Sequence, residues 1–178
     1  MHVVSTMGSG DLGRELDLDS VIQALGESYS IDVNRQSDSM VTLRLMPEGP
    51  ALTLYRTGTY QIRGTDSRDS LFQANQGLLD ALKSIGVNFS DPSFEQKNAV
   101  YLEDLETSVQ LEALSIHLGL ENMEYEPEQF PGVIYRPPDL EVVNLIFATG
   151  KTIISGTIHD EIAEKSAEHL RKQIAELH

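Results

Sequence analysis

Apolar positions fall into two kinds of pattern along the chain, and together they predict an ordered set of strands and helices. Short apolar runs bounded by turn residues predict strands near residues 2–7, 40–46, 50–56, 59–64, 97–103, 132–136, 141–148 and 151–156. Apolar residues with helical spacing predict helices near residues 17–26, 69–85, 108–118 and 160–177. Helices and antiparallel strands in this order favour an α+β fold.

The same order of elements occurs twice, and matching residues recur at a constant interval. Five identical residues lie 92 positions apart: Arg44 and Arg136, Thr57 and Thr149, Gly58 and Gly150, Gly64 and Gly156, and Thr65 and Thr157. Near the start of each copy, Leu18, Leu25 and Gly26 match Leu111, Leu118 and Gly119 at an interval of 93. The chain is therefore read as an internal duplication.

A turn-rich segment divides the two copies. It contains Asn88, Ser90, Asp91 and Pro92. We expect a first repeat over residues 1–86, a linker over 87–96 and a second repeat over 97–178. In each repeat a Thr-Gly pair, at Thr57-Gly58 and Thr149-Gly150, predicts a hairpin turn.

Composition narrows the class of protein. The 178 residues carry 28 acidic and 13 basic side chains, a net charge of −15, and no cysteine. The acidity either solubilises the surface or is an adaptation to high salt, where charge is strongly screened and is a weaker objection to nucleic-acid binding. No apolar run reaches the roughly 18–20 residues of a membrane span. We expect a soluble cytoplasmic protein with no membrane partner.

The strands of the second repeat are apolar on both faces. Side chains alternate, so one face carries Leu145, Phe147, Thr149, Lys151, Ile153 and Ser155. Helices on one side cover only one face. The other face is then left for a partner, a ligand surface or further protein, unless all these residues are ordinary core.

One motif is typical of a different class of protein, the nucleotide-binding enzymes. Residues 8–13 read Gly-Ser-Gly-Asp-Leu-Gly, a nucleotide-binding G-x-G-x-x-G, with Asp32 about 20 residues on. The preceding strand has only Val3 and Val4 as strongly apolar residues, and no βαβ series continues. The five histidines lack metal-ligand spacing. We predict no enzymatic activity and no cofactor.

Residues 125–136 and 145–156 resemble the most recognisable segment of the TATA-binding protein family. The resemblance is to the archaeal members, and the acidic composition is similar to that of a protein from a halophile. The duplication and the order of elements also fit. The resemblance implies a saddle of two repeats that share one curved antiparallel sheet. Its concave face binds the DNA minor groove and helices cover the convex face. Inserted phenylalanines and a sharp bend are established behaviour of that family.

The resemblance also implies roles for single residues. Phe130 and Phe147 correspond to one wedge pair, and Asn98 and Val100 to the central Asn-x-Val that contacts base edges. Arg136 and Lys151 would meet phosphates. Leu145, Ile153 and Ser155 would line the floor of the groove, and Thr149 is a further expected DNA contact. Apolar contact and shape suit the degenerate minor groove.

The acidic loop of the second repeat is expected to bind a protein. In the family, transcription factor B docks at the loop that holds Glu126, Glu128 and Gln129 here, and acidic side chains suit a basic partner. RNA polymerase machinery is a further implied partner. The sequence leaves open whether the free protein forms a homodimer.

The first repeat departs from this pattern. By the interval of 92, Phe130 corresponds to Asp38 and Phe147 to Tyr55. The equivalent face is polar, with Thr53, Tyr55, Thr57, Thr59, Gln61 and Arg63, and the acidic loop is replaced by residues 34–39. We expect Tyr55 and Arg63 to make the remaining DNA contacts, with at most one strong kink at the Phe130 and Phe147 end.

Two functions follow. The first is a general transcription initiation factor, nucleoid-associated, that binds the minor groove of TATA-type double-stranded promoter DNA and recruits transcription factor B. The alternative is a divergent paralogue that acts as a protein-interaction module or transcription regulator with weak or no TATA binding.

Overall fold

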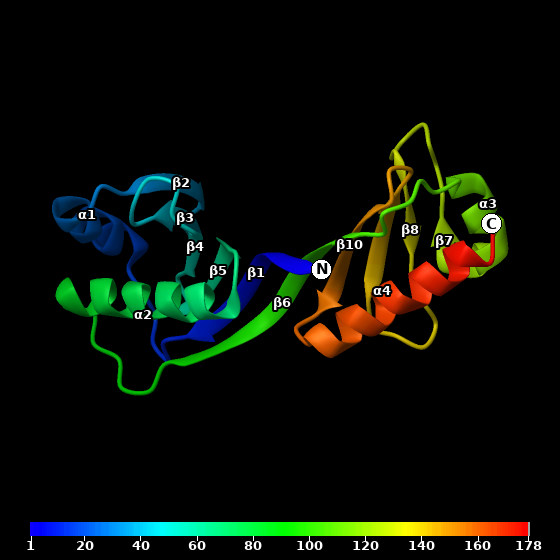
Figure 1. Cartoon of the computed structure of the whole chain (residues 1–178). Coiled ribbons are helices and arrows are strands. Elements are labelled where there is room, and N and C mark those ends of the chain that lie inside the picture. The colour runs from blue at the N-terminus through cyan, green and yellow to red at the C-terminus, as the bar shows by residue number, and fades with distance from the viewer. Residues whose placement is uncertain (178) are drawn as a thin grey trace. The chain divides into compact units, whose positions relative to one another are not determined.

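The computed structural model describes residues 1–177, which form two compact units (Figure 1). The N-terminal unit comprises residues 5–97. The C-terminal unit comprises residues 1–4 and the chain from Asn98 onward. Two long strands, β1 (His2–Asp11) and β6 (Ser93–Asp104), contribute residues to both units.

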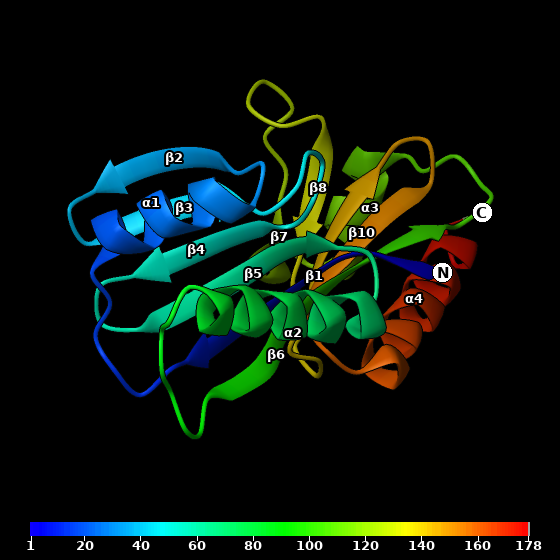
Figure 2. The same cartoon turned by 90° about the vertical axis from the view of Figure 1, so that its left-hand side faces the viewer.

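The N-terminal unit is an antiparallel sheet with two helices. Its strands lie in the order β2-β3-β4-β5-β1. In Figure 2, both helices lie on the viewer's side of this sheet. Residues that point from the sheet to the helices, among them Leu43, Leu54 and Ile62, share one buried cluster with Leu25 and Leu78. The elements are α1 (Leu18–Ser28), β2 (Asp32–Ser37), β3 (Met40–Arg44), β4 (Ala51–Tyr55), β5 (Thr59–Thr65) and α2 (Arg68–Ser84).

The C-terminal unit repeats this plan with strand order β6-β10-β9-β8-β7. Val133 and Ile146 of the sheet are buried with Leu114 and Leu170 of its helices, and a second cluster joins Ile154 to the final helix. The elements are α3 (Leu111–Leu118), the 3-10 helix η1 (Leu120–Asn122), β7 (Met123–Glu124), β8 (Gly132–Tyr135), β9 (Val143–Phe147), β10 (Lys151–Thr157) and α4 (Asp160–Ala175).

Equivalent glycines make equivalent turns in the two units. Gly58 follows β4 with φ of +90°, and Gly150 follows β9 with φ of +85°. A Cβ at either position would overlap a backbone carbonyl oxygen, that of Arg14 or that of Thr107. Only glycine fits both the left-handed backbone and the close approach. Both predicted hairpin turns are confirmed.

The structure adds strands that the sequence did not predict. β2 has no buried side chain, so it shows no apolar alternation. β7 has only two residues. β6 begins at Ser93, so the last residues of the expected linker are strand.

The glycines of the G-x-G motif have a packing role. β1 continues to Asp11, and a Cβ on Gly8 or Gly10 would overlap the ring of Phe94 or of Tyr60. The missing side chains let these two rings lie close against the strand. The first four residues of the motif, 8–11, are therefore strand, and the motif does not open a helix as a nucleotide-binding loop does.

Within residues 1–177, none of the helices combines the length and the apolar character needed to cross a bilayer.

A buried polar pair in the C-terminal unit has apolar equivalents in the other unit. Asn144 accepts a hydrogen bond from the Ser166 hydroxyl at 2.9 Å, but its Nδ2 has no hydrogen-bond partner among the described residues. The positions 92 residues earlier are Leu52 and Ala74. A buried donor without a partner costs about 1–3 kcal/mol.

We therefore expect Asn144→Leu with Ser166→Ala to raise the free energy of unfolding by about 1–3 kcal/mol. Ser166→Ala alone should lower it, because the Asn144 carbonyl then loses its donor. Urea unfolding followed by circular dichroism measures both. A double variant less stable than the single one would contradict this account.

Candidate nucleic-acid interface

The helices of the C-terminal unit cover one face of its sheet, and the other face is open. Along β9, Asn144 and Ile146 are buried while Val143, Leu145 and Phe147 are partly exposed. β10 alternates in the same way. The open face is therefore a continuous surface of side chains that no helix of the unit covers.

A row of four apolar side chains crosses this open face. Backbone pairing places Leu102 beside Ile153, Ile153 beside Leu145, and Leu145 beside Ile134. All four are partly exposed and none belongs to a buried cluster. We call Leu102, Ile153, Leu145 and Ile134 the apolar row. It includes Leu145 and Ile153, two of the residues that the sequence assigned to the groove.

The two phenylalanines expected as a wedge lie together at one edge of this face. The Phe130 and Phe147 ring centroids are 5.7 Å apart and the rings are tilted by 59°. Both rings are partly exposed. Gly132 pairs with Phe147, and a Cβ there would lie 2.9 Å from Phe130 Cε1 and 3.2 Å from Phe147 Cδ1. The missing side chain makes room for the ring pair.

A tight turn positions Phe130. The amides of Gln129 and Phe130 both donate to the carbonyl of Glu126 at 2.9 Å. Glu126, Glu128 and Gln129 are exposed around this turn. The side chains expected to bind a partner protein are thus held close to the phenylalanine pair.

Polar groups complete the open face. Asn98 Oδ1 accepts from the Gly156 amide at 3.1 Å, which orients its NH₂ group as a donor to a ligand. Val100, two residues along β6, and Ser155 of β10 are partly exposed.

The expected phosphate contacts are exposed but differ in their surroundings. Arg136 donates to Glu124 Oε1 at 2.5 Å, so it must exchange this partner to bind a phosphate. Lys151 and the turn residue Thr149 are exposed, and Lys151 lies opposite Asp104 in the strand register.

The N-terminal unit has the same row in polar form. Ser9 pairs with Gln61, Gln61 with Thr53, and Thr53 with Thr42. We call these four residues the polar row. They precede Leu102, Ile153, Leu145 and Ile134 by 93, 92, 92 and 92 positions. Thr42 and Thr53 share a hydrogen bond of 2.8 Å between their hydroxyls, and Arg63 Nη2 donates to Thr53 Oγ1 at 3.5 Å.

The wedge position also differs in the N-terminal unit. Tyr55 pairs with Met40, where the other unit pairs Phe147 with Gly132. The acidic loop is replaced by the β2–β3 hairpin. Its turn residue Asp38, which the interval pairs with Phe130, lines a hollow with Asp17, Asp19 and Arg56. Tyr55 therefore has no aromatic partner among the described residues.

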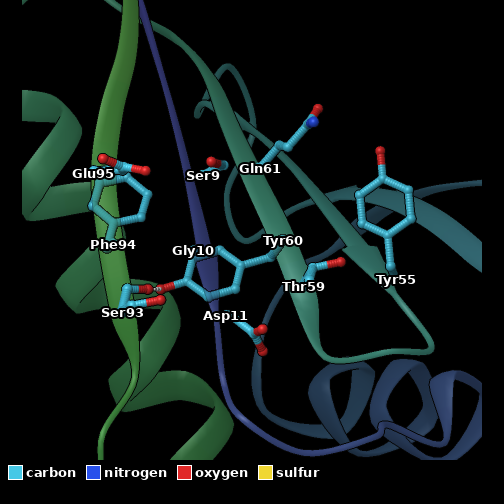
Figure 3. Close-up of a pocket in the computed structure, with 10 residues that line it drawn as sticks. All are labelled: Ser9, Gly10, Asp11, Tyr55, Thr59, Tyr60, Gln61, Ser93, Phe94 and Glu95. Carbon is cyan, nitrogen blue, oxygen red and sulfur yellow. Dashed lines mark hydrogen bonds between the residues drawn. The ribbon is translucent and has the colours of Figure 1, made fainter.

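A hollow of about 550 Å³ adjoins the polar row, with Gln61, Ser9 and Tyr55 in its wall (Figure 3). The ring of Tyr60 also lines it and stacks on Phe94, with centroids 5.9 Å apart and planes within 6°. Burial, and secondarily the charge of Asp11, raises the pKa of Tyr60 to about 12.

The sequence did not predict a role for Phe94, because this residue lies in the expected linker. An aromatic residue within a turn-rich segment was the signal that could have indicated it.

Comparison with known proteins gives a consistent result. A family model described as "Transcription factor TFIID (or TATA-binding protein, TBP)" matches residues 1–85 and 93–177. TATA-box-binding protein C of Halobacterium salinarum is 40% identical, over 99% of this chain and 98% of the relative. The TATA-box-binding protein of Haloarcula marismortui is 34% identical, over 99% of this chain and 94% of the relative.

A solved structure supports the fold. Methanococcus jannaschii TBP matches with a TM-score of 0.82 and 29% identity, over 98% of each chain. The predicted α+β fold class is confirmed by this match.

The space beside the phenylalanine pair can be tested with Gly132→Ala. Besides the rings, the new Cβ would meet the Ile146 carbonyl oxygen at 2.8 Å. Overpacking of this kind costs about 1–3 kcal/mol. We expect thermal unfolding to show that loss. The matched control is Gly77→Ala, where a Cβ meets nothing within 4 Å and should gain about 0.5–1 kcal/mol within α2. Equal effects would contradict the packing role of Gly132.

Proposed function

Since this chain belongs to the TATA-binding protein family, as its sequence predicted, we propose that it is a transcription initiation factor that binds the minor groove of TATA-type promoter DNA. The observation that carries the proposal is the apolar row beside the partly exposed Phe130 and Phe147 pair. An exposed apolar surface of this kind needs a ligand or partner to cover it.

The minor groove of A·T-rich DNA suits this surface. Its edges present acceptors in a degenerate pattern, so shape and apolar contact contribute most of the readout. Leu145 and Ile153 offer such contact without a competing donor or charge. The Asn98 amide, already oriented by Gly156, can donate to adenine N3 or thymine O2. Phe130 and Phe147 lie at one edge, where an apolar wedge can open a base step.

Phosphate contacts contribute less in this proposal. Arg136 and Lys151 are the basic side chains that flank the apolar row. Each neutralised phosphate adds to the salt dependence of binding. With few such contacts and a net charge of −15, affinity should depend on apolar burial and tolerate high salt.

The N-terminal unit binds differently in this proposal. Its row is polar, and no other aromatic ring of residues 1–177 stacks on Tyr55. Tyr55 can stack on a base step, and Arg63, whose Nη2 donates to Thr53 Oγ1 at 3.5 Å, has further donors that can meet a phosphate. We therefore expect one strong kink, at the end of the site that contacts Phe130 and Phe147.

The exposed Glu126 and Glu128 suit a basic protein partner. We propose that transcription factor B binds there and brings the polymerase machinery to the promoter on the nucleoid.

The kink can be tested by Phe130→Ala with Phe147→Ala. Loss of the wedge should abolish bending, measured by resonance energy transfer between the ends of a labelled duplex in molar salt. Phe72→Ala is the control, because that ring is 38% exposed on α2, away from the open face. Unchanged bending in the double variant would refute insertion of these rings.

The partner surface can be tested by Glu126→Lys with Glu128→Lys. Charge reversal should weaken binding of transcription factor B to the DNA complex at least tenfold in a pull-down or mobility assay. Glu164→Lys with Glu168→Lys reverses two exposed charges on α4 and is the matched control. Equal loss in both variants would indicate a general charge effect instead of a docking site.

The polar row favours a second function, that of a protein-interaction module without TATA binding. No mobility shift of a TATA duplex by the wild-type protein, together with intact binding of transcription factor B, would select this alternative.

A further inference from the structure

We propose that Gln61 and Ser9 make the N-terminal unit accept G·C pairs in its half of the DNA site, with the guanine N2 amine as the bound group. This inference rests on the proposed function. It names two residues that set base specificity and predicts a site with unequal halves.

Gln61 and Ser9 lie side by side on neighbouring strands. They are Cα partners on β5 and β1, and both are partly exposed. Neither side chain has a hydrogen-bond partner among the described residues. Figure 3 shows the Gln61 amide extended away from the Tyr60 ring, with no bond drawn to it. Both groups are therefore available to a ligand.

The other half of the polar row is already engaged. The Thr42 and Thr53 hydroxyls bond each other, Arg63 adds a donor to Thr53, and Thr53 is only 2% exposed. Gln61 and Ser9 are therefore the residues of the polar row whose side chains can contact bases.

The minor groove contains one kind of base donor, the N2 amine of guanine. When an apolar side chain covers this amine, the donor is buried without an acceptor, which is unfavourable. Ile153 and Leu102, the counterparts of Gln61 and Ser9, can supply no acceptor. Gln61 Oε1 and Ser9 Oγ can each accept from the amine, and Gln61 Nε2 can donate to A·T acceptors.

The surroundings of Gln61 favour a donor on the ligand. The residues that line the adjacent hollow include two carboxylates, Asp11 and Glu95, and no basic side chain. Glu95 pairs with Lys97, while Asp11 Oδ1, within residues 1–177, accepts only from the exposed amide of Gly13. Such a hollow disfavours phosphate and is electrostatically suited to an amine that donates hydrogen bonds.

The test replaces single A·T pairs by G·C at successive positions across an A·T duplex and measures affinity by fluorescence anisotropy in molar salt. Under the C-terminal unit, each replacement should weaken binding roughly 5- to 140-fold. Under the N-terminal unit, the change should stay within about twofold or favour binding.

The chain's lack of cysteine lets each half be located. A hydroxyl-radical reagent attached to Thr57→Cys or Thr149→Cys marks which end of the duplex contacts each unit.

Exchanging these two side chains between the units tests whether they set the base preference. Gln61→Ile with Ser9→Leu should impose the full penalty on the tolerant half, and Ile153→Gln with Leu102→Ser should relieve it in the other half. Circular dichroism of each variant confirms folding, and either exchange alone suffices if the other fails to fold.

Two outcomes overturn the inference while leaving the proposed function intact. One is an equal penalty at both halves for the wild-type protein, and the other is an asymmetry that neither exchange alters. Failure of the wild-type protein to bind the all-A·T duplex would remove the proposed function, and the inference with it. Binding of a basic peptide by the hollow, lost in Asp11→Asn, with no base preference would assign the hollow to a protein partner.

Discussion

Packing of helices against only one face of each sheet is the constraint on which the rest of the structure depends. Successive side chains of a strand point to opposite faces, so every second residue lies in the core, where burial requires mostly apolar side chains. Val41, Leu54 and Ile62 of one unit and Val133, Ile146 and Ile154 of the other meet this demand at positions 92 residues apart. The fold of both units follows from these apolar positions and from the turns at Gly58 and Gly150.

Residues on the opposite face do not pack against the helices, and on this face the two units differ. Leu145 and Ile153 remain apolar in one unit, while Thr53 and Gln61 occupy the same positions in the other. Met40 takes the place of Gly132, so a side chain stands at the position where glycine makes room for two rings in the other unit. The buried core and the proposed DNA-binding surface thus lie on different faces of the same strands.

The sequence predicted the α+β class, the order of the main elements and the duplication, because buried apolar residues and turn glycines leave a local signal. It also placed Phe130 and Phe147 on one surface. It did not predict β2, whose six side chains are all exposed. It could not show the ion pair between Arg136 and Glu124 or the stacking of Phe94 on Tyr60, because these contacts depend on register and on neighbours distant in sequence.

The β2–β3 hairpin has a consequence for solubility. β2 is an edge strand, so the backbone amides and carbonyls on its outer side have no neighbouring strand and could pair with another chain. Asp32, Asn34 and Arg35 surround the single apolar side chain, Val33, which is 36% exposed. Their charge and hydration oppose fibril-like stacking at this rim. The unit that has a strand where the other unit has a proline-containing loop thus carries polar residues along its exposed edge.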